Sequence, residues 1–125
     1  MSEVVEQGAE AVLSDGGDAI RIDLPRGVLI TGAIAEAAAA RFKELVSDEP
    51  RPVILTVTGV SSITREARAV LSRVAGALAF AVVGESPVDR VIANFVLGAA
   101  PLPCPGGFFT SESHALAWLE DVGAN

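Results

Sequence analysis

Two short apolar runs, residues 53–58 and 80–84, constrain the fold more than any other feature of the sequence. The first run is β-branched and almost wholly apolar, which is typical of a strand covered on both faces. A helix-start signal follows each run, with Thr64 after the first and Ser86-Pro87 after the second. Because a strand–helix–strand unit needs a right-handed crossover, the two runs are predicted to be parallel neighbours at the centre of a sheet.

The residues before these two runs have a pattern that is typical of a β-hairpin. Residues 11–14 suit a short strand, and the Asp-Gly-Gly-Asp sequence at 15–18 suits a turn, since glycine adopts positive φ at little cost. Residues 19–24 alternate apolar and charged side chains, as in a strand with one solvated face. Residues 28–30 form a short apolar segment that suits a further strand. We therefore expect the sheet to open with an antiparallel hairpin.

Two of the expected helices are indicated by their periodicity. Residues 34–46 place Ile34, Ala38, Phe42 and Leu45 on one stripe and include four consecutive alanines, which favour helix. The next helix is predicted over residues 64–79. Its buried stripe would comprise Ala67, Val70, Leu71, Val74 and Leu78.

The other two helices are indicated by their terminal residues. Ser86 is expected to be an N-cap, Pro87 the first helical residue and Gly98 the stop signal. The inward face of this helix is predicted to comprise Val88, Val91, Ile92 and Phe95. Residues 108–109 suit a last short strand. Thr110 is then expected to cap a final helix whose apolar residues are Ala115, Trp118, Leu119 and Val122.

These elements predict an α/β fold class. We expect a single mixed β-sheet that opens with an antiparallel hairpin, has parallel central strands, and carries about four helices packed on it. The chain of 125 residues suits one domain, which we place at residues 11–125. Residues 1–10 are acidic and aperiodic and are expected to form a flexible tail.

The charge distribution restricts the class of partner. The formal net charge is −7, and the five acids that precede Ala19 leave eleven acids against nine bases in the rest of the chain. Nucleic-acid binding is not expected, since it needs a surplus of Lys and Arg on one face. Cys104 is the one cysteine, so no intrachain disulfide can form and a cytoplasmic location is expected. No apolar stretch is long enough for membrane insertion, and the acidic N-terminus is unlike a signal peptide.

The order of elements and three local patterns resemble the STAS domain of bacterial anti-sigma-factor antagonists. The patterns are residues 52–60, the helix start Thr64-Arg65-Glu66-Ala67-Arg68, and residues 109–119. More closely, the chain resembles the uncharacterised STAS-like branch, which is related in fold to the CRAL-TRIO lipid-transfer proteins. The resemblance extends roughly from Ala19 to Val122. It implies a regulatory module that acts by binding another protein.

One departure from the STAS pattern concerns the phosphorylation switch. Antagonist STAS domains carry a phosphorylated Ser or Thr in an Asp-Ser-Ser-Gly motif at the start of the helix after the central strand. Here Arg65 and Glu66 occupy the positions of the two hydroxyl residues. The resemblance therefore implies a member that lacks the usual phosphoacceptor motif.

A candidate ligand site follows from the ends of the two central strands. Ligands of open α/β sheets lie beyond the carboxyl ends of parallel strands, where helix N-termini expose unpaired N–H groups. The residues expected there are Ser61, Ser62, Thr64, Arg65 and Ser86, which suit a small anion such as phosphate or carboxylate. The competing interpretation is that Thr64 and Ser86 are helix caps and that Arg65 is a solvated surface residue.

Candidate partner-binding residues lie on the second and third helices. Arg68 is expected to face the same way as Arg65, and Arg90 and Asn94 lie one turn apart on the third helix. Arginine is enriched in protein interfaces, which favours a role in recognition. The alternative is that all three belong to ordinary solvated faces.

The sequence offers few residues that could act in catalysis. His114 is the one histidine and has no recognisable nucleophile or metal-binding partner, and Cys104 has no evident activating base. We expect no enzyme activity, no cofactor and no metal site. Two function classes remain: a non-enzymatic protein-interaction module that binds a protein partner or forms a homodimer, and a protein that binds a small anionic or lipid ligand at the helix N-termini. A hydrolase or transferase is a third, weaker hypothesis.

Overall fold

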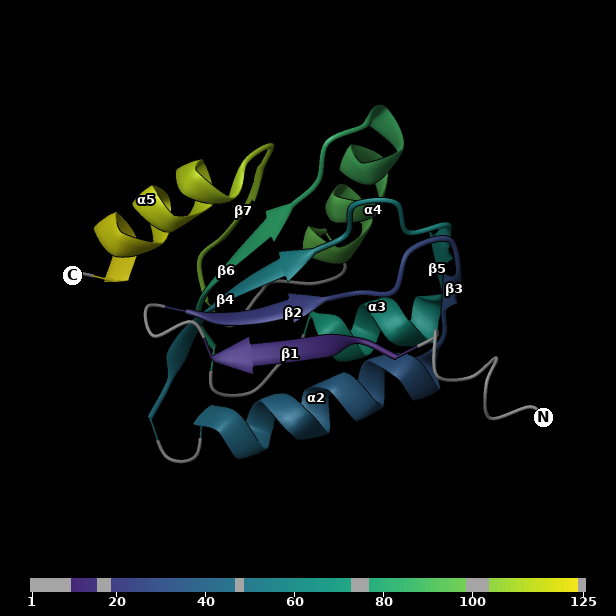
Figure 1. The fold of residues 1–125 in the computed structure, drawn as a ribbon, viewed down its shortest axis with the longest axis horizontal. Coiled ribbons are helices and arrows are strands. Elements are labelled where there is room, and N and C mark those ends of the chain that lie inside the picture. Colours follow the sequence, from purple (N-terminus) through teal and green to yellow (C-terminus); the bar gives the residue numbers. More distant parts are fainter. Residues whose placement is uncertain (1–9, 16–18, 47–48, 73–76, 99–103, 124–125) are drawn as a thin grey trace.

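A five-stranded mixed sheet forms the centre of the computed structural model, which describes residues 10–15, 19–46, 49–72, 77–98 and 104–123 (Figure 1). The strands lie in the order β1, β2, β4, β6, β7. Their bounds are Val12–Asp15 for β1, Ile20–Asp23 for β2, Arg51–Thr56 for β4, Ala77–Val83 for β6 and Gly106–Phe109 for β7. Strands β1 and β2 are antiparallel and the other pairs are parallel. The predicted hairpin and the parallel central pair are confirmed, although most of the hairpin turn, residues 16–18, lies outside the described residues.

Within the described residues, four helices cover the sheet unequally (Figure 1). Their bounds are Gly32–Val46 for α2, Arg65–Leu71 for α3, Pro87–Leu97 for α4 and Glu112–Gly123 for α5. Helices α2, α3 and α4 contribute to one large apolar core, and α5 contributes to a smaller one. The expected α/β class with four helices on a mixed sheet is therefore confirmed.

The central strands supply both cores because strand side chains alternate between faces. In β4, Val53 and Leu55 point into the large core and Ile54 into the small one. In β6, Phe80 and Val82 join the large core. The small core is formed mainly by short side chains, namely Ala19, Ala79, Ala81, Val83 and Ala115, together with Ile54 and Leu119. The expectation that both faces of the 53–58 run are covered is confirmed.

A second, very small sheet lies beside the first. Strand β3 (Leu29–Ile30) pairs in parallel with β5 (Ser62–Ile63). The predicted strand at residues 28–30 is therefore present, but it pairs outside the main sheet. The single sheet expected from the sequence is in fact a five-stranded sheet plus this two-stranded one. Residues 61–64 are held in place by it, because Ser61 and Thr64 donate backbone hydrogen bonds to Val28 and Ile30.

The second predicted helix is wrong in length. Helix α3 ends at Leu71, and its C-cap Ser72 donates its backbone N–H to Arg68 and Val70. Strand β6 begins at Ala77, so Leu78 is an exposed strand residue and not part of a helix stripe. Val74 lies outside the described residues. Alanine and leucine occur in both helices and strands. Residues 77–79 form a strand here because β6 pairs with β4.

The inward face predicted for α4 is partly wrong. Ser86, Pro87 and Gly98 mark its ends as expected. However, Val88 and Val91 are exposed, and the buried residues are Asp89, Ile92, Ala93 and Val96. Phe95 is half-buried. The buried stripe begins with Asp89, a carboxylate that hydropathy assigns to the solvated face. The helix is therefore rotated about its axis relative to the prediction.

The N-cap predicted for α5 is also wrong by one residue. The Ser111 hydroxyl accepts the backbone N–H of His114 at 3.2 Å, and the helix begins at Glu112. Serine and threonine have similar cap preferences, so adjacent Thr110 and Ser111 were not distinguishable from the sequence. The strand at residues 108–109 is present as the end of β7.

Candidate functional site

A buried carboxylate, Asp89, organises the edge of the sheet where the candidate site was expected. Its Oδ2 accepts backbone N–H groups from Glu85 at 2.8 Å and Ser86 at 3.0 Å, and its Oδ1 accepts that of Gly59 at 3.2 Å. The residue is only 2% exposed. Asp89 thus connects the start of α4 to the segment that follows β4.

The hydrogen bonds to Asp89 also set its charge state. Burial by itself raises the pKa of this carboxyl, but the backbone hydrogen bonds from Ser86, Glu85 and Gly59 outweigh that effect, so the pKa lies below its usual range. Asp89 is therefore an anion at neutral pH. It lies at the N-terminus of α4, where an external anion would otherwise bind.

Two of the predicted ligand residues have their hydroxyl groups in helix caps. The Thr64 hydroxyl accepts the backbone N–H of Ala67 at 3.1 Å, and the Ser86 hydroxyl accepts that of Asp89 at 3.1 Å. Ser86 and Asp89 together form a reciprocal capping box. Arg65, the third residue of this group, is exposed at the first position of α3.

The other two predicted ligand residues face α4. Ser61 and Ser62 are exposed and line an open cavity of about 330 Å³. The rest of its lining is apolar and comprises Ile63, Val88, Val91, Ile92 and Phe95. The structure therefore brings Ser61 and Ser62 together with side chains of α4, and Thr64, Arg65 and Ser86 are not part of this lining.

The predicted partner-binding arginines lie against aromatic rings. The Arg68 guanidinium lies over the ring of Phe95, 4.3 Å from its centroid, and Nη2 donates to the Gly98 carbonyl at 3.4 Å. The Arg90 guanidinium lies 4.8 Å from the ring centroid of Phe108. Such contacts hold a cationic group in a fixed orientation at the surface. Asn94 is exposed on α4.

Sequence reasoning missed the apolar part of this surface. Val88 is 57% exposed and Val91 is 67% exposed, and both lie beside Ser61 and Ser62. We call these four residues, together with Phe95, the α4 face. Exposed Leu29 is the strand partner of Ser62 and extends the apolar surface onto β3. The missed signal was Asp89 at the third position of a capping box, which turns Val88 and Val91 outward.

The residues considered for catalysis are separate from this face. His114 is exposed on α5, and Cys104 is half-buried. Burial raises the pKa of the Cys104 thiol, so the thiol is protonated and weakly nucleophilic at neutral pH. Within the described ranges, no three His, Cys, Asp or Glu side chains are grouped as a metal site would need.

Comparison with known proteins gives a family. The model of a domain of unknown function, DUF7793, matches residues 16–123. The chain belongs to the DUF7793 family. A search of curated proteins finds no match.

Solved structures identify the fold of this DUF7793 domain. It is similar to an uncharacterised protein of the DUF3478 family with a SpoIIAA-like fold from Shewanella loihica PV-4, with a TM-score of 0.62 and 13% sequence identity over 87% of this chain and 91% of that one. The resemblance to STAS domains is therefore confirmed at the level of the fold. The chain is also 44% identical to a protein of unknown function from Arthrobacter sp. FB24, over 86% of this chain and 97% of that one, with a TM-score of 0.36.

The helices that the structure describes are all too short or too polar to span a bilayer.

Proposed function

We propose that this DUF7793 domain is a non-enzymatic, cytoplasmic regulatory module that binds a protein partner, either a second copy of itself or a different protein, through its α4 face. The observation that carries the proposal is the exposure of Val88 and Val91 beside the cavity lined by Ser61 and Ser62. Adjacent exposed aliphatic side chains cost free energy in water, and they are typical of surfaces that become covered by a partner.

The surroundings of these valines support a protein partner. Arg90 and Asn94 provide polar groups on the same helix, and an apolar centre with a polar border is the usual composition of a protein interface. Arg68 and Arg90 are already ordered by their contacts with Phe95 and Phe108. Preordered side chains lose less conformational entropy when a partner binds.

A small anion or lipid at the helix N-termini has weaker support. Asp89 already accepts the N–H groups of Glu85 and Ser86, and the hydroxyls of Thr64 and Ser86 serve as caps. We also propose that binding is independent of phosphorylation at the usual STAS position, because Arg65 and Glu66 stand there.

A matched pair of variants tests the α4 face. Val91→Asp places a charge in its centre, while Val12→Asp makes the same change at a residue of similar exposure, 62%, on β1. Light scattering after size-exclusion chromatography gives the mass over a wide concentration range. We expect a homodimer that Val91→Asp dissociates and Val12→Asp leaves intact.

If the chain is monomeric, the partner is a different protein. A photo-crosslinking amino acid at position 91 should then capture a specific protein from native lysate, and excess Val12→Asp protein should compete while Val91→Asp protein does not. A monomer that captures no specific protein, or equal competition by both variants, would contradict the proposal. Both variants should unfold at the same urea concentration as the unmodified chain, because both side chains are exposed.

A further inference from the structure

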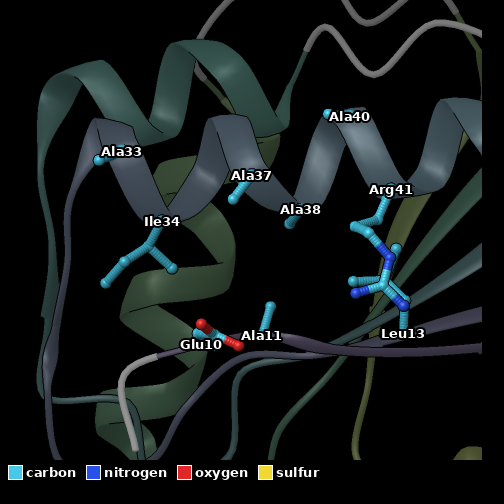
Figure 2. A pocket seen from close by; sticks show the side chains of 9 residues that line it. All are labelled: Glu10, Ala11, Leu13, Ala33, Ile34, Ala37, Ala38, Ala40 and Arg41. Carbon is cyan, nitrogen blue, oxygen red and sulfur yellow. The ribbon is translucent and has the colours of Figure 1, made fainter. Parts of the chain in front are cut away.

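A second hollow lies between α2 and β1, away from the α4 face. It has a volume of about 460 Å³ and is partly open to solvent; Figure 2 shows the side chains that line it. Its lining comprises Glu10, Ala11, Leu13, Ala33, Ile34, Ala37, Ala38, Ala40 and Arg41. Seven of these nine residues are apolar, which together with the volume is typical of small-molecule sites.

The helix side of this groove is formed mainly by alanine. Ala33, Ala37 and Ala40 recur along one side of α2, and all three are exposed toward the groove rather than packed on the sheet. Larger side chains at these positions would occupy the space between α2 and β1. Besides Ile34 and Arg41, the α2 residues of the lining carry only methyl groups, which leaves space between the helix and β1.

The size of the groove favours a small molecule over a protein. A stable protein interface involves about 20–30 residues on each side, and nine residues line this groove. The apolar lining would cover a hydrocarbon chain or an aromatic ring of a ligand, and the open side would leave its polar end in water.

The charged residues of the groove indicate which polar group the ligand carries. The side chains of Glu10 and Arg41 lie at separate ends of the opening in Figure 2. Among the residues that the structure describes, Arg41 forms no ion pair, so its guanidinium is available to a carboxylate. Glu10 repels an anion at the other end, which favours one orientation of the ligand.

We propose that the groove between α2 and β1 binds a small amphipathic carboxylate, with its apolar part against the alanines of α2 and its carboxylate on Arg41. The probe for this site is decanoate, used below the concentration at which it forms micelles. Decyltrimethylammonium has the same chain length and the opposite charge, so comparison of the two probes shows whether the groove prefers an anionic head group.

Nuclear magnetic resonance of the full chain locates the probe. We expect decanoate to shift the backbone amide signals of Leu13, Ala37 and Arg41 in a saturable manner. Decyltrimethylammonium should bind about tenfold more weakly, as expected for loss of one charge-assisted hydrogen bond. Binding of both probes with equal affinity, or shifts confined to residues outside the groove, would overturn the proposal.

Three variants complete the test. Arg41→Gln removes the charge and should weaken decanoate binding about tenfold. Ala37→Leu fills the groove with a good helix former and should abolish binding without unfolding α2. Lys43→Gln, an exposed charge on α2 outside the lining, should leave the affinity unchanged. If the signals of the groove residues instead depend on protein concentration without probe, the occupant is a second copy of the chain and the proposal fails.

Discussion

At the scale of single residues, Asp89 joins two segments of the chain at the edge of the sheet. Its two oxygens accept backbone N–H groups from two segments, nearby Glu85–Ser86 and Gly59, which precedes Asp89 by 30 residues in the sequence. An internal anion thereby satisfies N–H groups that a helix start otherwise leaves unpaired. Ser86 thus acts as a cap beside an internal anion, and Thr64 separately caps α3, as the competing interpretation of these residues predicted.

Replacing Asp89 with Asn tests this role. The amide retains one acceptor oxygen, so at least one of the three backbone N–H groups loses its partner in a buried place, and the others lose a charged acceptor. We expect Asp89→Asn to lower the free energy of unfolding by about 2–3 kcal/mol. Urea unfolding measures this change in the free energy of unfolding. Glu36→Gln, on the exposed side of α2, serves as the control and should change stability little.

The pH dependence of stability should report the same residue. Because the pKa of Asp89 is lower in the folded chain than in the unfolded chain, its contribution is complete at neutral pH. It is lost as pH falls from the ordinary value of about 4 through the folded value. The stability difference between the unmodified chain and Asp89→Asn should therefore shrink over that window. A difference that stays constant down to about pH 3 would contradict this account.

At the scale of elements, the turn between β6 and α4 depends on close approach. A Cβ atom on Gly84 would lie 2.6 Å from the Cβ of Asp89 and 3.3 Å from side-chain atoms of Phe108 and Val57. The first distance is shorter than real Cβ contacts, so the start of α4 would have to move. Glycine is required here for space next to the Asp89 cap.

We expect Gly84→Ala to destabilise the chain by about 1–3 kcal/mol, as overpacking does. Since the added methyl displaces Asp89, the effects of Gly84→Ala and Asp89→Asn should be less than additive in a double-mutant cycle. Urea unfolding of the two single variants and the double variant measures the coupling. Additive effects would mean that the turn and the cap are independent.

The helices show which features of an element depend only on residues close in sequence. The ends of α4 were predicted correctly because Ser86-Pro87 and Gly98 act within one turn of their own positions. Its buried face was not, because Asp89 is buried in a capping box and accepts one hydrogen bond from Gly59, a distant residue in the sequence. The helix α3 was predicted too long because Ala77 and Leu78 belong to β6, which pairs with β4.

At the scale of the whole molecule, two cores share one sheet. Strands β4 and β6 place successive side chains into opposite cores, so neither core persists without both strands. The tryptophan, Trp118, packs on the small core with its ring centroid 5.2 Å from that of Phe109. Its fluorescence therefore reports the α5 side of the sheet.

We expect the small core and the rest of the fold to unfold together. The urea transitions followed by Trp118 fluorescence and by far-ultraviolet circular dichroism should have the same midpoint. Leu119→Ala, which removes a buried side chain of α5, should shift both midpoints equally. A fluorescence transition at lower urea would show that α5 detaches before the sheet unfolds.

The sequence by itself determined the features that depend on local chemistry: strands from β-branched runs, helix ends from Ser86, Pro87 and Gly98, and the parallel central pair from the handedness of crossovers. The tertiary structure alone decided which side of α4 is exposed and where hollows remain. Those features depend on residues such as Gly59 and Asp89, which meet only when the chain folds. The burial of Asp89 is compensated by two local hydrogen bonds, from Glu85 and Ser86, and by one from distant Gly59, and the hydropathy period of the sequence contains no information about the last.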